Sequence, residues 1–82
     1  MSMTPERIRK RLVRVFNTIL PGKSAEEIPE ATMDNTEAWD SLATLSLFTL
    51  AEEEFGIKLG LDLIGQTKSF VALEKLVTEK VG

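Results

Sequence analysis

Hydrophobic positions divide the chain into three helix-like stretches, joined by segments without a sustained period. In the first stretch, apolar residues recur three and four positions apart, as in an amphipathic helix: Ile8, Leu12, Val15, Phe16 and Ile19. Thr4 and Pro5 suit the cap and first turn of this helix, and Pro21-Gly22 ends it.

The second stretch predicts a helix from about Ser41 to Phe55, capped by Asp40 and closed by Gly56. At 100° per residue, apolar side chains cover most of its circumference: Leu45, Leu47, Phe48, Leu50, Ala51 and Phe55. One narrow stripe remains, formed by Leu42, Ser46, Thr49 and Glu53. We therefore expect a mostly buried helix whose solvent-facing stripe includes an apolar residue, Leu42.

The last third of the chain predicts a short link, a brief helical turn and a final helix. Ile57-Lys58-Leu59 reads as extended, and residues 60–65 can form one helical turn between two glycines. Ser69 then caps a helix that ends near Lys80, with the apolar face Phe70, Leu73, Leu76 and Val77.

Residues 21–40 show no sustained period. Ser24 and Glu27 fit a capping box for one helical turn before Pro29, and Ile28 and Met33 are the expected contacts to the core. Loops of about 20 residues are uncommon in compact domains and are usually functional.

The fold class follows as all-α: a small bundle of three main helices, with a short helical turn before the last helix and a long loop after the first. A chain of 82 residues supports one hydrophobic core, so residues 1–82 form a single domain. No apolar run approaches the roughly 20 residues of a membrane span, and the N-terminus lacks a secretory pattern. We expect a cytoplasmic protein without a membrane span.

Cysteine and histidine are both absent from the sequence. Disulfides, thiolate nucleophiles, imidazole bases and the usual zinc ligands are therefore excluded. A serine hydrolase would also need a Gly-x-Ser-x-Gly elbow, which the chain lacks. We expect a protein that is not an enzyme, with no catalytic residues and no metal site.

Charge is unevenly distributed along the chain. The formal net charge is −3, and residues 24–82 are strongly acidic, which favours basic partners. The first helix instead carries a basic face made of Arg7, Arg9, Lys10, Arg11 and Arg14. Such a face could bind nucleic acid or lipid headgroups, but no aromatic or glycine-rich element is interleaved with the charges, so a solvated face is favoured and no nucleic-acid partner is expected.

One motif stands at the start of the second helix. Asp40-Ser41-Leu42 is followed by an apolar helix and then by Glu52-Glu53-Glu54-Phe55-Gly56-Ile57. In this motif, its spacing and the helix order, nearly the whole chain resembles the acyl carrier protein family. The resemblance implies a 4′-phosphopantetheine arm attached covalently to Ser41, flanked by Asp40 and Leu42, that holds acyl intermediates as thioesters.

Physical chemistry supports a phosphodiester at this serine. The first turn of a helix offers unpaired backbone N–H groups and the positive end of the macrodipole to an anion. Because the chain has no histidine to take its proton, Ser41 should be an acceptor that a separate phosphopantetheinyl transferase activates. The reactive thiol of the family belongs to the arm, in keeping with a chain that has no cysteine.

The resemblance also implies partner enzymes: acyl-activating, synthase or acyltransferase enzymes that a monomeric carrier meets through its exposed stripe. The expected partner-binding residues are Leu42, Ser46, Thr49 and Glu53. This chain departs from the family at Ala38, where many members have glycine, and at Ala43 and Ser46, where fatty-acid members often have acids. These departures and the basic first helix favour a specialised pathway.

Several alternatives stay open. The chain could be an aminoacyl or peptidyl carrier, or a non-carrier helical interaction module. Trp39 either packs against the loop or touches the arm, and Glu52-Glu53-Glu54 is either a solvated helix end or a docking patch. Space for the cargo depends on how five side chains pack: Leu45, Phe48, Leu63, Ile64 and Phe70.

Overall fold

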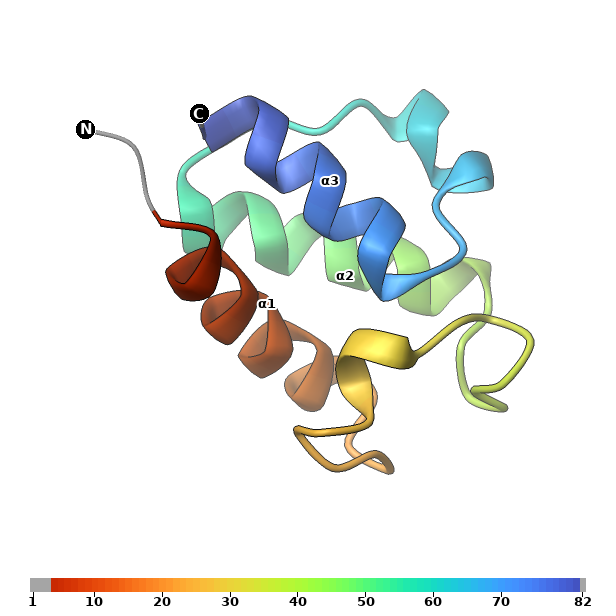
Figure 1. The fold of residues 1–82 in the computed structure, drawn as a ribbon. Helices are drawn as coiled ribbons and strands as arrows, with labels where there is room; N and C mark the ends of the chain where they lie inside the picture. The colour runs from red at the N-terminus through yellow and green to blue at the C-terminus, as the bar shows by residue number, and fades with distance from the viewer. Residues whose placement is uncertain (1–3, 82) are drawn as a thin grey trace.

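The chain folds into a small helical bundle, as the hydrophobic pattern predicts. The computed structural model describes residues 4–81, and no strand occurs within that range. The elements in chain order are α1 (Pro5–Ile19), η1 (Ile28–Glu30), α2 (Ser41–Phe55), η2 (Leu61–Gln66) and α3 (Phe70–Val81). Figure 1 shows the three α-helices side by side, with the long loop crossing the end of the bundle where α1 stops and α2 starts.

Helix α1 begins and ends where the sequence predicts. The Arg7 backbone N–H donates to Thr4 Oγ1 (3.3 Å), and Pro5 occupies the first turn. At the other end the Leu20 N–H donates to the Phe16 carbonyl (2.6 Å), directly before Pro21. The buried face is Ile8, Leu12, Val15 and Phe16.

The long loop opens with the predicted capping box. The Glu27 N–H donates to Ser24 Oγ (3.3 Å), and the Ser24 N–H donates back to Glu27 Oε1 (3.0 Å). Hydrogen bonding to its carboxylate, first from the Ser24 backbone N–H and next from the Ser24 side chain, holds the pKa of Glu27 below its ordinary value. One short helix, η1, follows at once.

Backbone hydrogen bonds then fasten the loop to the start of α3. The Phe70 N–H donates to the Ala31 carbonyl, and the Met33 N–H donates to the Lys68 carbonyl, both at 2.9 Å. Ile28 is fully buried and Met33 packs partly against the core, as expected. Ala31 is a further buried contact that the pattern did not reveal.

The segment before α3 also matches expectation, with a longer turn than predicted. Helix η2 covers Leu61–Gln66, one residue beyond the second glycine. The Ala72 N–H donates to Ser69 Oγ (3.1 Å), which confirms Ser69 as the cap of α3. That helix continues to Val81, one residue past the predicted end.

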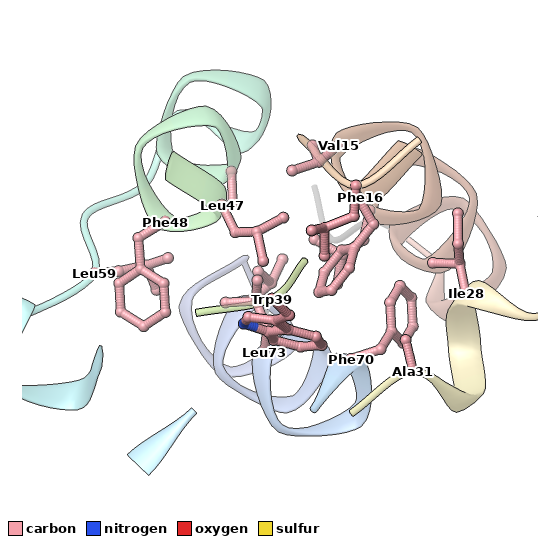
Figure 2. Close-up of a cluster of buried hydrophobic side chains, with 14 of the residues drawn as sticks. Val15, Phe16, Ile28, Ala31, Trp39, Leu47, Phe48, Leu59, Phe70 and Leu73 are labelled. Carbon is pink, nitrogen blue, oxygen red and sulfur yellow. The ribbon is translucent and has the colours of Figure 1, made fainter. Parts of the chain in front are cut away.

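An aromatic cluster joins the loop to two helices at the centre of the core. The Phe16 ring lies 5.3 Å from Trp39 in an edge-to-face arrangement and 4.9 Å from Phe70. Figure 2 shows these three rings between the helices, with Ile28 and Ala31 beside them. The loop therefore contributes side chains to the core and does not merely lie across its surface.

An ion pair joins α1 to α3 at the edge of the core. Arg9 Nε and Nη2 donate to the Glu74 carboxylate at 2.7 and 2.8 Å, and the guanidinium lies 5.7 Å from the Phe70 ring centre. The hydrogen bond to Glu74, and next its charge, raise the pKa of Arg9.

Candidate functional site

The start of α2 is held by its own backbone and by one carboxylate. Asp40 is extended (φ −122°, ψ −171°), and its Oδ1 accepts from the Ala43 N–H at 2.8 Å. The Asp40 carbonyl accepts from the Thr44 N–H at 3.0 Å. Asp40 is thus the predicted helix cap, with an exposed side chain.

Trp39 fixes the same helix end from inside the protein. Its side chain is only 3% exposed, and the indole Nε1 donates to Thr44 Oγ1 at 2.8 Å. The Thr44 hydroxyl in turn donates to the Asp40 carbonyl (3.1 Å). Trp39 therefore packs inside the protein, in line with the packing role that the sequence left open beside contact with the arm.

Thr44 is a residue that the sequence reasoning missed. It is 1% exposed, although the helical pattern marked no polar residue of α2 as buried. The one available signal was Trp39: an indole N–H that is buried needs an acceptor, and Thr44 is a hydroxyl within the next helical turn.

Ser41 is the first residue of α2 and is exposed. No group among residues 4–81 forms a hydrogen bond with its hydroxyl, and the backbone N–H groups of Ser41 and Leu42 also lack an acceptor there. A nucleophilic oxygen and two free N–H donors therefore lie together at the positive end of a 15-residue helix. An anionic group attached to this oxygen would find both donors within the same turn.

The predicted stripe on α2 is exposed along its whole length. Leu42 is 74% exposed, and Ser46, Thr49 and Glu53 are exposed as well. The stripe and Ser41 lie on one continuous surface, because residues 42, 46, 49 and 53 follow the helix axis from the first turn to the last.

One residue placed in the buried set was assigned wrongly. Leu45 is 41% exposed, whereas the pattern placed it among the covered side chains. The buried face of α2 is narrower than predicted and consists of Thr44, Leu47, Phe48 and Ala51. Leu45 lies about 110° from the middle of that face, so it joins Leu42 at the surface.

The three acids at the end of α2 have separate surroundings. The Leu59 N–H donates to Glu52 Oε2 at 2.7 Å, so this carboxylate braces the link after the helix. Glu54 pairs with Arg11 at 3.7 Å. Glu53 projects from the stripe, and its carboxylate has neither an ion pair nor a hydrogen bond in the described part of the chain.

The side chains considered for cargo space do not gather around one hollow. Phe48 and Phe70 are fully buried, Leu63 and Ile64 are half-buried, and Leu45 is exposed. A surface hollow of about 310 Å³ lies between η2 and α3, and Leu63 is the one member of this set that lines it. Ser41 lines neither this hollow nor the larger groove of about 660 Å³ between α1 and α3.

No model of a known protein family matches the chain, and no curated protein matches it either. Within residues 4–81, no helix has both the length and the apolar character that crossing a membrane requires.

Proposed function

We propose that this chain is an acyl carrier protein that holds acyl intermediates on a 4′-phosphopantetheine arm attached to Ser41. The observation that carries the proposal is the Ser41 hydroxyl, which is exposed at the first residue of α2 and has no hydrogen bond within residues 4–81, while Trp39 and Asp40 before it are fixed. The proposed site of action is the cytoplasm, with the chain as a monomer.

The residues around Ser41 divide the work of presenting it. Asp40 caps the helix, and Trp39 anchors the preceding backbone in the core, so the serine is held at a constant position. No hydrogen bond from residues 4–81 to its hydroxyl has to break before it reacts. The transferase would supply the base that removes the Ser41 proton, since the chain has no histidine.

The arm would contribute the thiol that forms thioesters with acyl groups. Free backbone N–H groups at Ser41 and Leu42 suit the phosphodiester that links the arm to the protein. The chain's own task is then to position the arm and to be recognised.

The stripe of α2 is the proposed docking surface for partner enzymes: a transferase first, then acyl-activating, synthase or acyltransferase enzymes. Leu42 is its apolar residue, the exposed Leu45 lies beside it on the next turn, and Glu53 is its one charge. A surface of this kind favours partners that offer an apolar patch with a basic residue at its edge.

Loading with the arm tests the proposal. Incubation with coenzyme A and a broad-specificity phosphopantetheinyl transferase should add the mass of one phosphopantetheine to the protein. The Ser41→Ala variant should keep its fold and gain no mass, because the acceptor oxygen is gone. Intact-protein mass spectrometry measures both, and fragmentation locates the modified peptide.

A matched control is available at another exposed serine. Ser24→Ala removes a hydroxyl from the loop and should leave loading within about twofold of wild type, because its effect is confined to a capping box. Wild-type protein that stays unmodified by several transferases would exclude the carrier function. An aminoacyl or peptidyl carrier would load in the same way and would be distinguished by the group found on protein from its native host.

A further inference from the structure

Helix α1 carries three exposed cations in one row, which we call the α1 cationic stripe: Arg7, Lys10 and Arg14. Residues three and four positions apart lie on the same face of a helix, so the three charges project together. None of them forms an ion pair with an acid in residues 4–81.

Two neighbouring arginines show the contrast. Arg9 holds Glu74 at 2.7 Å, and Arg11 reaches Glu54 at 3.7 Å. These pairs tie α1 to α3 and to α2. The fold thus uses the cations at the edges of the basic face and leaves the middle row to the solvent.

The charges of the stripe are poorly placed relative to one another and to the helix ends. Lys10 and Arg14 are like charges at positions i and i+4, which repel each other. Arg7 stands near the N-terminal end, where the macrodipole favours acids, and no basic residue lies in the last turn. Only Lys10 has a favourable neighbour on the helix, Glu6 four positions earlier, so helix stability does not account for Arg7 and Arg14, whereas recognition of an anionic partner accounts for all three.

The surroundings indicate which anion. The apolar side of α1 is buried, from Ile8 at 2% to Leu12 at 0% exposure, so the helix has nothing to insert into a bilayer. Its one aromatic residue, Phe16, is also buried, which leaves no ring for stacking on nucleic-acid bases.

The charge of the remaining chain narrows the choice further. Residues 24–82 carry a large excess of acids, which would repel an extended polyanion beyond the stripe itself. A local acidic patch on a folded surface can match three charges spread over about 10 Å of helix without meeting that repulsion. We propose that the α1 cationic stripe docks an acidic patch on a partner protein, independently of Ser41.

Binding of an oligo-glutamate peptide tests this proposal. A fluorescently labelled peptide of about four glutamates, which spans the stripe and extends little beyond it, is titrated with full-length protein at about 20 mM and about 150 mM salt. Wild type should bind, and more weakly at the higher salt. The variant R7Q/K10Q/R14Q should bind at least about tenfold more weakly, with a thermal midpoint no lower than wild type because repulsion is relieved.

The control variant lowers the net charge by the same three units, at lysines outside the stripe. K58Q/K68Q/K80Q replaces three exposed lysines outside α1 and should bind the peptide within about twofold of wild type. If the stripe variant failed to fold, Lys10→Gln alone should still weaken binding by about threefold, and an unchanged affinity would overturn the proposal.

Three further results would overturn it: no binding by wild type, equal losses in the stripe and control variants, or tighter binding to another polyanion at the same salt. The other polyanions are vesicles of phosphatidylcholine with about a quarter phosphatidylglycerol, and a single-stranded oligothymidylate. Loading of Ser41 is unaffected by any of these outcomes, so the two proposals fail separately.

Discussion

At the scale of single residues, the hydrogen bond between the Trp39 indole and the Thr44 hydroxyl connects the end of the long loop to the first turn of α2. The bond is 2.8 Å long, and both side chains are buried. The same hydroxyl donates to the Asp40 carbonyl, so the Thr44 oxygen bonds both the Trp39 indole and the Asp40 backbone, directly before Ser41. A satisfied buried chain of this kind holds the helix start in one arrangement.

Thr44→Val should therefore destabilise the protein. Valine keeps the shape of threonine but leaves the buried indole N–H without an acceptor, which costs about 1–3 kcal/mol. Urea unfolding measures the loss in the free energy of unfolding.

A second threonine on the same helix gives the matched control. Thr49 is exposed, and its hydroxyl donates only to the Leu45 carbonyl. Thr49→Val should change the free energy of unfolding by no more than about 0.5 kcal/mol. Equal effects of the two substitutions would contradict the role given to Thr44.

At the scale of elements, the residues on either side of α2 determine where this helix begins and ends. Asp40 caps its first turn, and Gly56 ends it in the left-handed conformation (φ 62°), with its N–H bonded to the Glu52 carbonyl. A side chain at Gly56 would meet no atom within 4 Å, so the need for glycine lies in the backbone alone.

Gly56→Ala should accordingly cost about 1–2 kcal/mol, the penalty of the left-handed region for a residue with a Cβ. Thermal or urea unfolding measures it.

Gly22→Ala is the comparison for this prediction. Gly22 also has open space around it and does not have a positive φ. Alanine there should be neutral or stabilising by up to about 1 kcal/mol, because it restricts the unfolded chain. A larger loss at Gly22 than at Gly56 would show that the backbone conformation is not the cause.

The surface of α2 shows how far helical periodicity reaches. The 100° repeat placed Leu42, Ser46, Thr49 and Glu53 correctly on the exposed side. It misplaced Leu45 and missed Thr44, because the width of a buried face depends on how closely the neighbouring elements approach. An apolar residue at the edge of the buried face can therefore be either buried or exposed, and its helical angle alone does not tell which.

At the scale of the whole molecule, the long loop and the helices form one core. Trp39 comes from the loop, Phe16 from α1 and Phe70 from α3, and their rings are in contact. Detaching the loop from the helices would break the contacts between these rings. We therefore expect the loop to unfold together with the helices.

Trp39 makes this expectation measurable, since it is the only tryptophan and the chain has no tyrosine. Urea unfolding followed by Trp39 fluorescence should give the same midpoint as unfolding followed by far-ultraviolet circular dichroism, which reports the helices. The Phe16→Leu variant should lower the free energy of unfolding by about 1–3 kcal/mol, and both urea midpoints should fall together. A fluorescence change that precedes the loss of helix would show instead that the loop is a separate unit.

The helices, their caps and the position of the candidate serine could all be predicted from the amino-acid sequence. These are local properties: a side chain such as Asp40 or Ser69 caps the turn beside it, and apolar spacing reports which face is inward. Three features needed the folded chain: Trp39 is buried, Leu45 is exposed, and Arg9 and Arg11 are paired whereas the α1 cationic stripe has no ion pair within residues 4–81. The burial of Trp39 against Phe16, the exposure of Leu45 and the arginine pairs depend on how closely residues far apart in the chain approach each other, and periodicity along one helix contains no information about that distance.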